Sequence, residues 1–78
     1  MKINDYADLR RHVGKNITCT YDTGAAITGE LLLCKPASGP VLVVVMKNAD
    51  ICAPDGSIIE HHPGFSFVPN VQVGIEAE

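Results

Sequence analysis

The stretch that decides the fold runs from Gly14 to Leu31 and reads GKNITCTYDTGAAITGEL. After Gly14, polar and apolar residues alternate, which is the pattern of a β-strand with one buried face. Asp22-Thr23-Gly24 then interrupts the alternation with residue types that form tight turns. The stretch therefore predicts two strands joined by a short turn.

The alternation on the two sides of this turn agrees in register. Pairing across the turn places Cys19 opposite Ile27 and Ile17 opposite Gly29, so the apolar residues share one face. This agreement predicts an antiparallel hairpin. Gly29, in the middle of the second strand, predicts a sharp bend or a bulge.

One short helix is predicted before the hairpin, from residue 4 or 5 to residue 12 or 13. Asn4 or Asp5 provides an N-cap for the first free N–H groups. Tyr6, Leu9 and Val13 recur with helical spacing and form one apolar face. The glycine that follows ends the helix.

Further strand-like segments follow the hairpin, separated by turn-forming residues. The predicted strands are residues 41–46, 57–60, 65–68 and 71–75, with a short extended piece at 51–53. Residues 47–50 are predicted to form a turn, and His61-His62-Pro63-Gly64 to interrupt the sheet. The run at 41–46 does not alternate, as expected when both faces are covered. Its second cover is either a central position in the sheet or a neighbouring subunit.

These elements predict a single mainly β domain over residues 1–78. A short N-terminal helix, at about residues 4–13, precedes a five-stranded, strongly bent antiparallel sheet that forms a small open barrel, at about residues 15–76. A hydrophobic content of 46% in 78 residues excludes intrinsic disorder. It also suggests that another subunit covers part of the apolar surface.

Charge and cysteine content narrow the functional classes. The net charge is −3, which argues against a strong phosphate binder, although residues 1–15 carry +2 and the remainder −5. The three cysteines are odd in number and irregularly spaced, so reduced thiols are expected. The chain has no apolar run of membrane-spanning length and begins without a secretory signal, so a cytoplasmic location is expected.

The first part of the chain resembles the first signature motif of the Sm-like (LSm) proteins. The matching positions are Gly14, Lys15, Ile17, Cys19, Tyr21, Gly24, Ile27, Gly29 and Leu31. The resemblance implies a helix followed by a five-stranded open barrel. It also implies a homo-oligomeric ring, in which the fourth strand of one subunit pairs with the fifth strand of the next. We expect five to seven subunits, joined by edges near residues 57–68 and 71–76.

The resemblance further implies single-stranded, often uridine-rich RNA as a partner. The loop at residues 35–40 lacks the Asp and Asn that the family uses there, and Val68-Pro69-Asn70 stands where the family has Arg-Gly. Asn70 is then the candidate base-reading amide. The candidate phosphate contacts are Arg10, Arg11 and Lys15. The alternative for these cations is a solvated set of charges that complements the helix dipole.

Catalysis, a metal and a cofactor are not expected. Cys52, Asp55, His61 and His62 are residue types that bind zinc, but their spacing is not that of a known site. No segment has the local sequence of an activated cysteine or of a phosphate-binding loop. Phe65 and Phe67 share a strand face and are expected in the core or at an interface.

Two functions from different classes remain. One is an Sm-like ring that binds single-stranded RNA in a weak or non-standard way. The other is a ring-forming structural or protein-interaction module that does not bind RNA.

Overall fold

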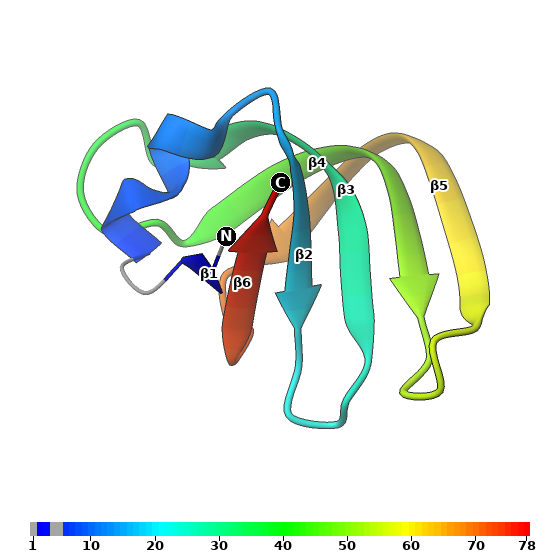
Figure 1. Ribbon diagram of the computed structural model, residues 1–78. Helices are drawn as coiled ribbons and strands as arrows, with labels where there is room; N and C mark the ends of the chain where they lie inside the picture. The colour runs from blue at the N-terminus through cyan, green and yellow to red at the C-terminus, as the bar shows by residue number, and fades with distance from the viewer. Residues whose placement is uncertain (1, 4–5) are drawn as a thin grey trace.

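A single antiparallel sheet dominates the computed structural model, which describes residues 2–3 and 6–78. The elements in chain order are β1 (Lys2–Ile3), η1 (Tyr6–His12), β2 (Asn16–Thr20), β3 (Ala26–Lys35), β4 (Val43–Cys52), β5 (Ile58–Pro69) and β6 (Gly74–Ala77). The strands lie in the order β1-β6-β2-β3-β4-β5. The long strands β3, β4 and β5 lie side by side and bend strongly, and η1 lies at one end of the bent sheet (Figure 1).

The predicted hairpin is confirmed. β2 pairs with β3 so that Cys19 lies opposite Ile27 and Ile17 opposite Gly29. At the turn, Gly24 has a φ of +89°, which is favourable for glycine alone among common residues. The mainly β prediction for the fold is confirmed with it.

The helix differs from the prediction in type and length. It is a seven-residue 3₁₀ helix that ends at His12, so Val13 lies outside it and is exposed. The helix lies in the connection between β1 and β2, and 3₁₀ turns are frequent in connections between strands. The predicted N-cap, Asn4 or Asp5, lies outside the described residues.

The bend of the sheet is built from irregular positions on two neighbouring strands. The register between β3 and β4 shifts at Gly29, as predicted, and the register between β4 and β5 shifts at Asn48. Asn48 has a φ of 55°, in the left-handed region that Asn tolerates. The turn predicted at 47–50 is therefore wrong: a bulge lets β4 bend and continue to Cys52.

The interruption predicted at residues 61–64 is also wrong. β5 runs without a break from Ile58 to Pro69, because it is an edge strand with β4 on one side. An edge strand tolerates a proline such as Pro63, since the missing N–H need not serve a neighbouring strand.

The end of the chain corrects the predicted strand count. The strand predicted at 71–75 begins later, at Gly74, because the N–H of Val71 turns back to the C=O of Pro69, 2.9 Å away. A sixth strand, β1, lies outside β6 and pairs Ile3 with Ile75. The sheet is strongly bent but not closed, and β1 and β5 form its two edges.

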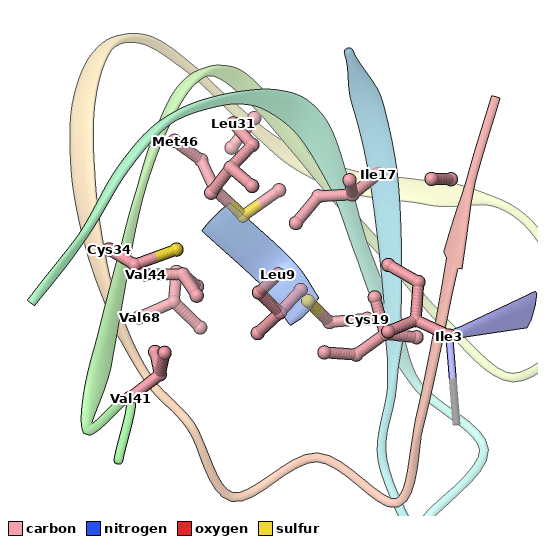
Figure 2. Close-up of a cluster of buried hydrophobic side chains, with 13 residues drawn as sticks. Ile3, Leu9, Ile17, Cys19, Leu31, Cys34, Val41, Val44, Met46 and Val68 are labelled. Carbon is pink, nitrogen blue, oxygen red and sulfur yellow. The ribbon is translucent and has the colours of Figure 1, made fainter. Parts of the chain in front are cut away.

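The core lies on the concave face of this sheet. Leu9 of η1 is fully buried in the middle of the cluster, with side chains from β2, β3, β4 and β5 around it (Figure 2). Val44, Val45 and Met46 are all buried because β4 is a central strand between β3 and β5. A central position in the sheet therefore explains the buried part of the apolar run, residues 44–46, without a second subunit, whereas Leu42 is 65% exposed.

Candidate functional site

The Arg10 side chain forms hydrogen bonds within the chain itself. Its guanidinium Nη2 donates to the C=O of Pro36 at 2.7 Å and to the C=O of Gly39 at 2.9 Å. These bonds tie η1 to the loop between β3 and β4. A guanidinium fixed on backbone carbonyls has fewer donors left for an RNA phosphate.

Asn70 holds the other end of the same loop. Its Nδ2 donates to the C=O of Val41 at 2.8 Å, and its Oδ1 accepts from Nε2 of Gln72. The backbone N–H of Asn70 also donates to the C=O of Leu42, 2.9 Å away. The amide that was predicted to read a base is thus engaged within the protein.

The other two predicted phosphate contacts are accessible. Arg11 and Lys15 are exposed, at the end of η1 and just before β2. Lys15 borders a polar notch together with Asn16, Glu30 and Glu78. The acidic groups of this notch reduce the positive potential that a nucleic acid would meet there.

We expect Arg10→Ala to lower the free energy of unfolding by about 1–2 kcal/mol, because two charge-assisted bonds at an exposed site are lost. Urea denaturation followed by circular dichroism measures the change. Lys15→Ala is the control and should stay within about 0.5 kcal/mol of the wild type, as exposed substitutions usually do. Equal stabilities of the two variants would contradict the assignment of Arg10 as a loop anchor.

The most unusual surface of the molecule is the edge strand β5. Its four large apolar side chains are exposed to 62% at Ile58, 66% at Ile59, 70% at Phe65 and 64% at Phe67. Single exposed apolar residues are common, but a group of them along one strand with an open edge is a feature of interaction surfaces. Phe65 and Phe67, expected in the core or at an interface, are therefore not in the core of this chain.

The two phenylalanines lie on the convex side of the sheet. Phe67 is opposite Val45 on β4, which in turn is opposite Leu33 on β3, and this Leu33 is 43% exposed. The ammonium of Lys35 lies 5.2 Å from the ring centroid of Phe67. Leu33, Val45 and Phe67 thus form a row across β3, β4 and β5 that ends in an accessible aromatic ring at the sheet edge.

A cleft of about 260 Å³ borders β5. Its lining residues are Tyr21, Ile27, Ala49, Ile51, His62, Ser66, Phe67, Val68 and Pro69. The cleft is mostly apolar, with His62 and Ser66 as polar groups on β5. The edge strand therefore borders an apolar cleft, and Phe67 belongs both to the lining of this cleft and to the exposed aromatic pair.

The two histidines are placed on β5 and paired with acids. Nδ1 of His61 lies 2.5 Å from a carboxylate oxygen of Asp50, and Nε2 of His62 lies 3.5 Å from one of Glu60. Among the residues that the structure describes, no three His, Cys, Asp or Glu side chains gather into a metal-binding group. Cys52 and Asp55 do not join the two histidines in one cluster.

Two of the cysteines, Cys19 and Cys34, have buried thiols that pack in the core. Burial raises the pKa of the Cys19 thiol from 9.0 to about 11, and burial is also the main cause of the raised pKa of Cys34. Both thiols therefore stay protonated near neutral pH, and a protonated thiol is a poor nucleophile. In the part of the chain that the structure describes, the three cysteines are free.

No protein-family model, no curated protein and no solved structure matches the chain. Within the described residues, no helix has the length and apolar character needed to cross a membrane.

The sequence reasoning missed the role of the 63–69 segment. An edge was expected near residues 57–68, but reading His61–Gly64 as an interruption split β5 into two short pieces, so the continuity of this edge was missed. The signal was present in Phe65-Ser66-Phe67, which alternates and contains no charge. The alternation predicts a strand, and the nearby Pro63 favours an edge position or a bulge for it.

Proposed function

We propose that this protein is a small assembly module that joins copies of itself through the open edge of β5. The observation that carries the proposal is a twelve-residue edge strand with four exposed large apolar side chains. No catalytic activity is part of the proposal. It takes up the second of the two functions that the sequence left open.

The physical reason for self-assembly is that the backbone N–H and C=O groups at the open edge of β5 lack a partner strand. A strand edge presents a row of free N–H and C=O groups, and monomeric proteins commonly protect such edges with charges, short strands or a covering loop. In the segment from Pro63 to Pro69 no side chain is charged. An uncharged, aromatic segment at the edge supports the view that another strand covers it.

The expected Sm-like ring of five to seven subunits is one form that this assembly can take. It would join β5 of one subunit to β6 of the next. The support for it is the resemblance of residues 14–31 and the presence of an open β5 edge.

RNA binding is the second candidate function, and exposed Arg11 and Lys15 favour it. Against it, Arg10 and Asn70 are held by the loop between β3 and β4. Titration of labelled uridine-rich and adenine-rich oligonucleotides at two salt concentrations tests it. Binding through phosphates must weaken steeply as salt rises. If no oligonucleotide binds at about 50 mM salt, where such contacts are strong, RNA is not the ligand.

Self-assembly is tested by multi-angle light scattering between about 1 and 200 μM, the range where interfaces of modest size associate. We expect the wild type to exceed the mass of one chain. The double variant Phe65→Lys/Phe67→Lys should remain a monomer, because two charges then occupy the edge. Val13→Lys, at another exposed position, is the control and should assemble like the wild type. A wild type that stays monomeric throughout would refute the proposal.

A further inference from the structure

The direction of the backbone groups on β5 can be derived from its end. The N–H of Asn70 points to the C=O of Leu42, so the preceding carbonyl, that of Pro69, points away from β4. Residues two apart on a strand direct their N–H and C=O groups to the same side. The pairing of residues 65–69 with 43–47 is regular, so Phe65 and Phe67 also direct these groups outward.

Two prolines bound the segment in which Phe65 and Phe67 direct their hydrogen-bonding groups outward. Pro69 has no N–H, and its C=O already accepts from the N–H of Val71 at 2.9 Å. Pro63, beyond the bulge, has no N–H either. Between these two prolines the edge therefore offers one compact set of donors and acceptors, on Phe65 and Phe67.

We infer that β5 pairs in antiparallel fashion with β5 of a second copy, about a two-fold axis at Ser66, and so forms a closed dimer. The inference rests on the proposed self-assembly and names the edge that the partner uses. In this register Phe65 faces Phe67 of the second copy, and Phe67 faces Phe65. Each pair can exchange two N–H···O=C bonds, as the hydrogen-bonded pairs of an antiparallel ladder do.

The side chains fit this arrangement as well as the backbone does. Cross-strand aromatic pairs stabilise antiparallel sheets, and the two Phe pairs lie on the same convex face. Pro63 of one copy faces Pro69 of the other, where neither has an N–H to leave unsatisfied. No charged residue of β5 lies between these prolines, so the register places no like charges opposite each other.

The two phenylalanines provide part of the area that a reversible dimer needs. A phenylalanine side chain buries roughly 200 Å², and these two are 70% and 64% exposed, so together they provide about 270 Å² per copy. That is about a third of the ~800 Å² per partner in an interface of standard size. Leu33 and the edge backbone lie beside them. We therefore expect association in the micromolar range rather than a permanent dimer.

The opposite edge of the sheet explains why the partner strand is β5 and not β6. β1 pairs with the outer side of β6, with Lys2 opposite Glu76 and Ile3 opposite Ile75. Ile3 is buried there, with 6% of its surface exposed. A head-to-tail ring through β6 must remove β1 and expose Ile3. Symmetric pairing of β5 needs no such rearrangement.

A cysteine placed on the two-fold axis tests the arrangement directly. Ser66 would face Ser66 of the second copy in a non-hydrogen-bonded pair, whose Cα atoms lie about 4.5 Å apart, within the range of a disulfide. We expect Ser66→Cys, in a Cys52→Ser background, to form a covalent dimer when oxidised with diamide. Ser57→Cys in the same background is the control, because residue 57 lies far from the axis and should not cross-link.

Sedimentation equilibrium provides the second measurement. Phe67→Lys should weaken association at least about 30-fold, the loss typical of a central aromatic residue in an interface. Val73→Lys, at an exposed position next to β6, should leave it unchanged. Growth beyond two chains, weakening by Val73→Lys, or equal cross-linking of both cysteine variants would overturn the β5 dimer while leaving self-assembly intact. A wild type that never associates would overturn both.

Discussion

Gly29→Val is expected to lower the free energy of unfolding by about 2–4 kcal/mol, the cost of forcing a side chain into a filled space. A Cβ at this position would lie 3.0 Å from the carbonyl oxygen of Lys47 and 3.1 Å from the Cα of Ala49. Both are backbone atoms of β4, so the strands must separate where they bend. For a domain of this size the melting temperature should fall by about 10–25 °C.

Gly74→Val is the matched control for this prediction. A Cβ at Gly74 meets nothing within 4 Å, and the residue begins a strand as Gly29 continues one. Thermal unfolding followed by circular dichroism should therefore give a melting temperature near that of the wild type for Gly74→Val. An unchanged melting temperature for Gly29→Val would show that the strands are not closely packed at the bend.

The local pattern of the sequence was enough to predict the hairpin and its bend. The register of Cys19 with Ile27 follows from alternation and turn chemistry, which act over a few residues. The errors occurred where tertiary structure overrides local signals. Asn48 and Pro63 resemble turn residues, but in the sheet they lie in β4 and β5, which continue through bulges.

The edge expected near residues 57–68 came from the family resemblance, because the local pattern alone does not show which strand lies at an edge. The alternation of Phe65 and Phe67 predicts a shared face but not that β5 is an edge, because edges depend on which strands pair. The pairing of β1 with β6 involves residues at opposite ends of the chain. Arg10 and Asn70 were chosen for their chemistry, and their bonds to the loop between β3 and β4 come from contacts 26 and 29 residues away.

The seven-residue helix should be an integral part of the core, and Leu9→Ala tests this. The Leu9 side chain is fully buried at the centre of the cluster and is contributed by η1 (Figure 2). Removing it leaves a cavity between η1 and the sheet, which in comparable cores costs about 3–4 kcal/mol. A short 3₁₀ helix has little stability of its own, so loss of this contact should also release it from the sheet.

Val13→Ala provides the control, since Val13 lies just beyond the helix and is 48% exposed. Urea unfolding should show less than about 1 kcal/mol of loss for Val13→Ala, because little apolar surface is uncovered. Leu9→Met, which nearly conserves volume, should recover most of the stability. Similar losses for Leu9→Ala and Val13→Ala would mean that the sheet closes its core without η1. In that case the concave face of the sheet, and not the helix, accounts for the stability of the fold.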